Sequence, residues 1–153
     1  MDKTVLCYLK RNDKYLMLFR NKEKDDINFG KWLGIGGHIE KSETKEQAIV
    51  REVKEETGLD LLSFQYRGEL FFKDDDYEEM IYLFTSDDFK GDLKECDEGT
   101  LEYVHKNKIM SLNLWEGDKV FLPKLLNTSE HISLNVYYIK GKLVRVEERP
   151  NED

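Results

Sequence analysis

Three glutamates have the type and spacing to bind a divalent metal. Glu52, Glu55 and Glu56 lie within five consecutive positions of a segment that is typical of a helix. At about 100° per residue they span an arc of about 100°, so their carboxylates project to one side. Carboxylates this close repel one another, and Mg²⁺ prefers such oxygens while sharing its coordination sphere with water and phosphate. The spacing therefore indicates a metal site. The alternative is a solvated helix face with ordinary Lys and Arg ion pairs.

A glycine-dense segment precedes these glutamates. Residues 30–37 contain four glycines in eight positions, among them Gly36 and Gly37. Glycine permits positive φ angles and a close approach of the backbone to another group. We therefore expect the backbone of this segment, rather than its side chains, to contribute to a site.

One helix must position the glutamates. Residues 44–57 are typical of a helix, with Ser42 or Glu43 just before it and Gly58 as its C-terminal stop. An apolar stripe beside the glutamates should pack this helix against a sheet. The residues of that stripe are Ile49, Val50 and Val53.

The remaining elements are mostly strands. The first two strands should form a hairpin, because residues 11–14 between them are typical of a turn. A second helix is expected over residues 115–126, with Pro123 at its edge or at a break. The expected strands are residues 4–9, 15–19, 62–72, 80–85, 101–104, 136–139 and 142–146. This order predicts an α/β fold: a sandwich with a mixed sheet and two main helices in one domain, residues 1–147, and a short, frayed C-terminal tail over 148–153.

Composition excludes several classes of function. The 153 residues are 39% hydrophobic and 37% charged, which fits one compact domain under a charged surface. A formal net charge of -8 would repel DNA or RNA, whose binding needs a basic surface. Cys7 and Cys96 suggest no disulfide framework, and neither a signal peptide nor an apolar run of about 20 residues is evident. We expect a cytoplasmic protein without a membrane or nucleic-acid partner.

The whole segment from Gly37 to Leu59 resembles the Nudix box, G-x5-E-x7-R-E-U-x-E-E-x-G-U with U apolar. At ordinary residue frequencies such a match has a chance probability below about 10⁻⁸ per starting position. The matching positions are Gly37, Glu43, Arg51, Glu52, Val53, Glu55, Glu56, Gly58 and Leu59.

The resemblance implies roles for these residues. The helix glutamates, helped by the Gly37 carbonyl, would bind Mg²⁺, for which Mn²⁺ could substitute, and one of them, with Glu52 as the first candidate, would help deprotonate water. Glu43 and Arg51 would form an ion pair that braces the loop against the helix. The catalytic residues implied are Glu43, Arg51, Glu52, Glu55 and Glu56.

Two further segments, residues 32–37 and 96–104, resemble the MutT-type subgroup, which hydrolyses oxidised purine nucleoside triphosphates. That likeness makes Glu98 an outlying metal ligand, although it is also compatible with an ordinary solvated glutamate.

Residues 114–118 are similar to the segment that supplies a base-stacking Trp and a base-reading Asp in that subgroup. Trp115 and Asp118 would take these roles; the alternatives are a core Trp and an Asp favoured by a helix dipole. Two departures weaken the match: Leu33 replaces an Asn that contacts the base in the mammalian enzyme, and Gly117 replaces the first of two adjacent Asp residues. The expected substrate-binding residues are Leu33, Gly36, Phe72, Trp115 and Asp118.

These observations predict Mg²⁺-dependent hydrolysis of a nucleoside triphosphate, such as 8-oxo-dGTP, to a monophosphate and pyrophosphate. Other nucleotide substrates stay open, namely ADP-ribose, a nucleotide sugar or a dinucleoside polyphosphate. So does a non-catalytic, nucleotide-binding Nudix module, although such a module need not keep the whole box. The partner expected is a small-molecule nucleotide, and the chain could be a monomer or a homodimer.

Overall fold

The computed structural model of the chain describes residues 1–150, which form nine strands, two α-helices and one 3₁₀ helix. The elements in chain order are β1 (Asp2–Arg11), β2 (Lys14–Phe19), β3 (Trp32–Leu33), β4 (Ile35–His38), α1 (Lys45–Thr57), β5 (Asp60–Asp74), β6 (Tyr77–Lys90), β7 (Thr100–His105), the 3₁₀ helix η1 (Lys106–Ser111), α2 (Asp118–Asn127), β8 (Ile132–Ile139) and β9 (Lys142–Glu148).

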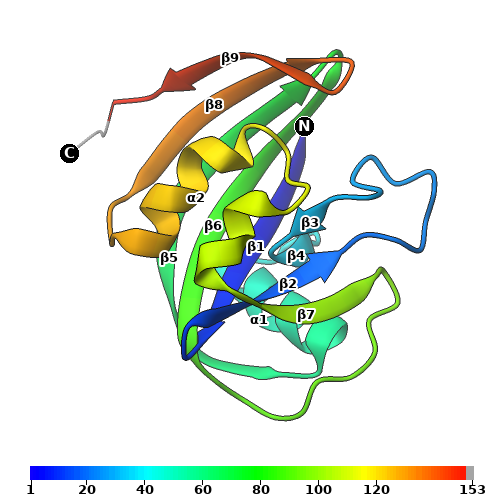
Figure 1. The fold of residues 1–153 in the computed structure, drawn as a ribbon, viewed down its shortest axis with the longest axis vertical. Helices are drawn as coiled ribbons and strands as arrows, with labels where there is room; N and C mark the ends of the chain where they lie inside the picture. Colours follow the sequence, from blue (N-terminus) through cyan, green and yellow to red (C-terminus); the bar gives the residue numbers. More distant parts are fainter. Residues whose placement is uncertain (151–153) are drawn as a thin grey trace.

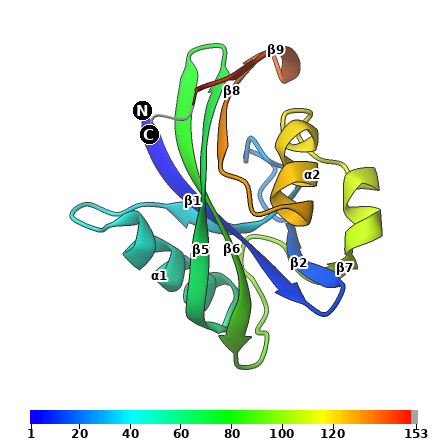
Figure 2. The same ribbon diagram turned by 90° about the vertical axis from the view of Figure 1, so that its left-hand side faces the viewer.

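The strands form one mixed sheet in the order β3-β2-β1-β6-β5-β8-β9, with β4 paired to β1 and β7 paired to β2. The β1–β6 and β5–β8 pairs are parallel, and the other pairs are antiparallel. Helix α1 covers one face of the sheet, while α2 and η1 lie on the other (Figures 1 and 2). The expected α/β sandwich with a mixed sheet and two main helices is therefore confirmed.

Strand β1 divides the interior into two cores because its side chains alternate between the two faces of the sheet. Val5, Cys7 and Leu9 pack with Ile49 and Val53 of α1 in one core. Tyr8 packs with residues of α2 in the other core. Cys7 is a buried free thiol.

Helix α1 starts at Lys45, one residue later than expected, and its N-cap is Thr44 rather than Ser42 or Glu43. The apolar stripe is also narrower than expected. Ile49 and Val53 are fully buried, whereas Val50 is 41% exposed, so the expected contact of Val50 with the sheet was wrong. A step of about 100° along the helix carries this side chain out of the contact arc.

The second helix differs more from expectation. It starts at Asp118, which leaves Trp115 in the preceding loop, and Pro123 lies inside it. The expectation that Pro123 marks an edge or a break was therefore wrong. The proline removes one backbone donor. The C-terminal end of the helix is anchored by the buried Arg67, which donates to the Leu125 carbonyl over 2.6 Å.

The last strand extends past the expected domain boundary at residue 147. Strand β9 continues to Glu148, and the Arg149 amide donates to the Ser133 carbonyl over 2.9 Å. The Arg149 guanidinium also donates to the Asn135 side chain over 2.7 Å. Residues 151–153 of the expected tail lie outside the described residues. Over residues 1–150, no helix has the length and apolarity needed to cross a membrane.

Candidate functional site

Helix α1 is capped at both ends, which sets the direction of its glutamates. At its start the Thr44 hydroxyl accepts from the Gln47 amide, and the Gln47 side chain accepts from the Thr44 amide. At its end Gly58 adopts a left-handed conformation, with φ of 82°, and its amide donates to the Lys54 carbonyl.

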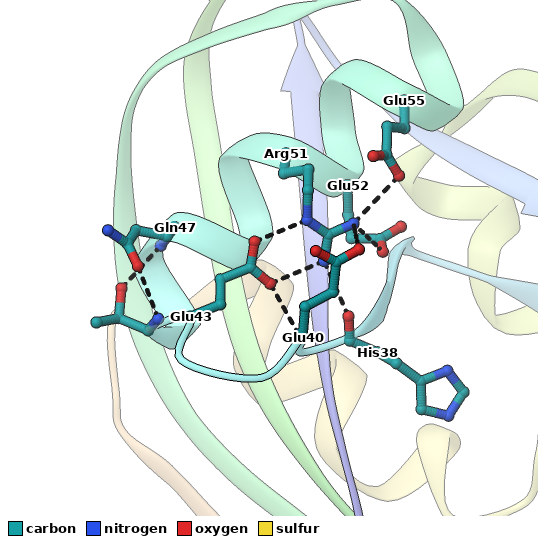
Figure 3. Close-up of polar contacts among 8 residues, drawn as sticks. His38, Glu40, Glu43, Gln47, Arg51, Glu52 and Glu55 are labelled. Carbon is teal, nitrogen blue, oxygen red and sulfur yellow. Dashed lines mark hydrogen bonds and ion pairs between the residues drawn. The ribbon is translucent and has the colours of Figure 1, made fainter.

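Arg51 connects the loop before α1 to the helix (Figure 3). Its guanidinium contacts both carboxylate oxygens of Glu43, at 2.7 and 2.8 Å, so the expected ion pair is present. It also donates to the His38 carbonyl, to Glu52 over 2.8 Å and to Glu55 over 3.1 Å. Its hydrogen bonds lower the pKa of Glu43 to about 2. Arg51 therefore offsets part of the carboxylate repulsion that the sequence argument assigned to metal.

Glu52 lies against the glycine segment. Its side chain is only 12% exposed, and burial raises its pKa although Arg51 opposes that shift. A Cβ atom added to Gly37 would lie 2.6 Å from the Glu52 carboxyl group. Glycine at this position therefore lets the Glu52 carboxylate rest directly on the β4 backbone.

Glu56 differs from the other two helix glutamates. It is 6% exposed, and its Oε2 atom has no hydrogen-bond partner in the described residues. Burial, followed by the neighbouring carboxyl group of Glu98, raises its pKa. Glu98, from the loop before β7, thus lies against Glu56, while Arg20 approaches Glu98 at 3.4 Å. A buried, unpaired carboxylate requires either a proton or a cation.

The candidate donors have the chemistry of a divalent-metal site, but over residues 1–150 their side chains do not yet converge. In the part of the chain that the structure describes, no three His, Cys, Asp or Glu side chains already converge as a complete ligand set. The oxygen chemistry fits nevertheless, because the candidate donors are carboxylates and the Gly37 carbonyl. The unpartnered Oε2 of Glu56 fits as well. Glu52 and Glu55 would have to turn away from Arg51 to join them.

A cavity of about 210 Å³ connects this region to the second helix. Gly37 and Glu98 line it near α1, so two of the five expected metal ligands border it. The expected substrate-binding residues also line it, and these are Leu33, Gly36, Phe72, Trp115 and Asp118. The cavity therefore joins the expected substrate-binding residues to two of the expected metal ligands, whereas Glu52, Glu55 and Glu56 are not part of its lining.

Trp115 is both a core residue and part of the cavity wall. It is 7% exposed, and its indole ring meets Phe72 and Tyr138 edge-on, each at 5.2 Å between centroids. Its Nε1 donates to the Asn28 side chain over 2.8 Å, which fixes the plane of the ring. The two alternatives from the sequence, core Trp and ligand-facing Trp, are thus compatible.

Asp118 likewise combines its two alternative roles. It is the first residue of α2, where the helix dipole favours a negative charge, and it lines the cavity. Burial raises the pKa of its carboxyl group to about 7, although Lys31 opposes the shift. A group that titrates near neutral pH can either accept or donate a hydrogen bond to a ligand.

Comparison with known proteins identifies the family. A family model described as the NUDIX domain matches residues 2–125. The chain belongs to the Nudix hydrolase family. The expectation drawn from Gly37 to Leu59 is therefore confirmed.

Relatives of this Nudix hydrolase include curated bacterial and animal proteins. It is 31% identical over 124 residues to the uncharacterized Nudix hydrolase YvcI of Bacillus subtilis, covering 77% of this chain and 75% of that protein. It is 30% identical over 138 residues to an oxidized purine nucleoside triphosphate hydrolase of Danio rerio, covering 85% and 83% of the two chains. A mutator MutT protein from Bacillus halodurans superposes with a TM-score of 0.87 at 23% identity, over 99% of this chain and 100% of the other, which supports the MutT-type fold.

Several polar residues of the cavity in this Nudix hydrolase were not among the sequence candidates, and Thr4 and Glu79 are two of them. Thr4 and Glu79 line it beside Ile81. The expected strand over residues 80–85 started too late to include Glu79. Side chains alternate between the two faces of a strand, so a strand that started one residue earlier would have placed Glu79 on the same face as Ile81.

A second, larger cleft of about 340 Å³ lies by the C-terminal half of α2 in this Nudix hydrolase, away from the box residues. Its most buried cation, Arg67, is 5% exposed and is held by backbone carbonyls, Leu125 through Nη1 and Glu130 through Nε and Nη2. This guanidinium therefore stabilises the end of α2 and is not free to bind an anion.

Proposed function

We propose that this Nudix hydrolase converts a nucleoside triphosphate to a nucleoside monophosphate and pyrophosphate with Mg²⁺, and that oxidised purines such as 8-oxo-dGTP are candidate substrates. The observation that carries the proposal is the single cavity that joins Gly37 and Glu98 to Trp115 and Asp118. The names of the oxidized purine relative from Danio rerio and of the nucleoside triphosphatase NudI from Salmonella agona, 32% identical over 89 residues, support the choice of substrate class.

The size of the cavity supports a binding mode in which the base lies inside it and the phosphates lie outside. Its volume of about 210 Å³ is below the roughly 300–1,000 Å³ of pockets that enclose a whole drug-sized ligand. The cavity therefore suits the base, with Trp115 as an aromatic wall and Asp118 as a polar contact. The phosphates would extend past Gly36 and Gly37 towards the exposed side of α1, where the Glu55 side chain is 58% exposed.

The residues of the box would then hold and orient the phosphates. Glu52, Glu55, Glu56, Glu98 and the Gly37 carbonyl would hold Mg²⁺, or Mn²⁺ in its place, which neutralises phosphate charge and acidifies water when bound. Glu52 would accept a proton from the attacking water, whose oxygen bonds to phosphorus as pyrophosphate leaves.

Arg51 and Glu43 would act by positioning. Their bidentate pair fixes the loop and the helix to each other. Arg51 would release Glu52 and Glu55 as these side chains turn to the metal. The net charge of -8 makes a small nucleotide, rather than a nucleic-acid polymer, the expected partner. The two free cysteines are compatible with a reducing cytoplasm.

The test is a product assay with Mg²⁺ over 8-oxo-dGTP, dGTP, other nucleoside triphosphates, ADP-ribose and nucleotide sugars. Release of pyrophosphate from triphosphates, fastest from 8-oxo-dGTP, is the expected result. Turnover restricted to ADP-ribose or nucleotide sugars would refute the substrate class. Nucleotide binding without any turnover would indicate a binding module instead.

A further inference from the structure

Glu79 places a carboxylate in the wall of the cavity. It lies on β6, on the same face as Tyr77 and Ile81, and all three line the cavity. Its Oε2 accepts from the Thr4 hydroxyl over 2.7 Å, and its Oε1 accepts from the Tyr77 hydroxyl over 2.6 Å. Each carboxylate oxygen is thus held by one hydroxyl group, which fixes the direction of the side chain.

These two hydrogen bonds leave the negative charge of Glu79 uncompensated. Across residues 1–150, no Lys, Arg or His side chain lies within ion-pair distance of it. An ionised carboxylate has about four acceptor positions, so two hydroxyl donors leave capacity for a ligand. A donor brought by the ligand would form a charge-assisted hydrogen bond, which is about twice as strong as a neutral one.

A second carboxyl group faces the same cavity. Asp118 is 7% exposed, and within the described part of the chain its side chain makes neither a hydrogen bond nor an ion pair. Leu33, Phe72 and Trp115 supply largely apolar walls between these acceptors. Glu79 and Asp118 have no cationic partner among the described residues, so they favour a base that brings N–H donors, because a base without them would leave buried carboxyl groups unsatisfied. Arg20 and Asn28 add donors elsewhere in the same lining.

We propose that Glu79 is a specificity-determining residue, whose carboxylate accepts a hydrogen bond from an amino group of the purine base held in the cavity. Thr4 and Tyr77 are positioning residues that direct this carboxylate into the cavity. The inference rests on the proposed function, since it names the feature of the base that the same site reads.

The experiment compares substrates that differ by one amino group. dGTP and dITP differ only in the 2-amino group, and dATP and purine deoxyriboside triphosphate differ only in the 6-amino group. In the wild type, removal of one of these groups should lower kcat/KM by about tenfold or more, the factor that a hydrogen bond to a charged group contributes.

Two variants at Glu79 and one control assign that factor to the carboxylate. Glu79→Met removes the acceptor and keeps the side-chain length, while Glu79→Gln keeps an acceptor for the two hydroxyls and removes the charge. The control is Glu78→Gln, because Glu78 is the neighbouring residue on the opposite face of β6 and does not line the cavity. The quantity compared is the ratio of kcat/KM for the substrate with the amino group to kcat/KM for the substrate without it. This ratio should be near 1 for Glu79→Met, intermediate for Glu79→Gln, and equal to the wild-type ratio for Glu78→Gln.

Calorimetric dissociation constants of the matching nucleoside monophosphates, measured without metal, provide a readout that is independent of turnover. They should show the same ranking of dGMP over dIMP, or of dAMP over purine deoxyriboside monophosphate, and lose it in Glu79→Met. The inference would be overturned if the wild type did not distinguish the paired nucleotides. It would also be overturned if both Glu79 variants distinguished them as well as the wild type does. If the wild type hydrolyses no triphosphate, the proposed function fails, whereas the monophosphate constants still decide the role of Glu79.

Discussion

Adding one methyl group at Gly37 is expected to move Glu52 without removing any charge from the site. The new Cβ atom would lie 2.6 Å from the Glu52 carboxyl group, whereas ordinary contact begins at 3.4 Å. The carboxylate must therefore retreat by about 0.8 Å. A misplacement of about 1 Å in a catalytic arrangement can lower the rate about 100-fold, so we expect Gly37→Ala to lose about that factor in kcat.

The fold should tolerate this change, because the crowded atoms are the end of a flexible side chain and the φ angle of Gly37 lies outside the left-handed region. The thermal midpoint should fall by no more than about 4 °C, which corresponds to about 1 kcal/mol in a domain of this size. Gly36→Ala provides the contrast. Its Cβ atom would lie 1.7 Å from the Val5 carbonyl oxygen, a backbone atom of β1, so this variant should lose the folded state.

The assay measures kcat for pyrophosphate release with saturating nucleotide and Mg²⁺, together with the thermal midpoint of each variant. A Gly37→Ala enzyme with the wild-type kcat would refute the reasoning, since Glu52 could then not work from its place against β4. An unfolded Gly37→Ala protein would refute the claim that only the side chain has to move. The same measurements on Gly36→Ala show whether Gly36 is needed for folding, as its contact with the β1 backbone indicates, while Gly37 is needed for the position of Glu52.

Three further predictions concern the same site. Glu56→Gln should lower turnover about 100-fold if Glu56 holds the metal as proposed, because it removes a charge from that site. It should also raise the metal-free thermal midpoint, because it removes a buried, unpaired carboxylate; a lower midpoint would contradict this account. Trp115→Phe should raise KM for purine nucleotides about fivefold through weaker stacking, and an unchanged KM would restrict Trp115 to the core. Burial raises the Asp118 pKa from 3.8 to about 7. Between these two pH values the folded protein holds a proton that the unfolded chain has released, so the free energy of unfolding falls as pH rises through this range. Asp118→Asn should therefore gain stability over the wild type from about pH 4 to about pH 7, by at most about 4 kcal/mol, and the gain should then stay constant; parallel pH profiles in denaturant titrations would exclude it.

The sequence predicted the elements that local rules determine. The box helix has a capping residue, an apolar stripe and a terminal glycine, and it appears within one residue of its expected start at residue 44. The hairpin of β1 and β2 follows from the turn residues between them, and Asn12 there has a positive φ of 58°. The ion pair of Glu43 and Arg51 was expected from the family pattern and is present.

Other features depend on contacts between distant segments. Val50 had the right type for a buried position, but the direction of the helix face against the sheet decides its exposure. Pro123 lies inside α2, and the end of that helix is anchored by Arg67, more than 50 residues earlier in the chain. Glu79 enters the cavity only because β6 pairs in parallel with β1, which brings Thr4 beside it. Pairing of this kind leaves no local signal in the sequence.

The Arg67 anchor also affects the rigidity of the cavity. The buried Arg67 of β5 donates one hydrogen bond to the Leu125 carbonyl of α2 and two to the Glu130 carbonyl in the loop that follows the helix. The start of α2 is tied to β8, because the Gly117 amide donates to the Tyr138 hydroxyl over 2.6 Å. Both ends of α2, and therefore the wall that carries Asp118, are fixed before any ligand arrives. Little conformational entropy remains to be lost on binding. Discrimination between bases should then depend on fit to a preformed surface, and the amides of α2 should be among the slowest in the chain to exchange with solvent, with or without nucleotide.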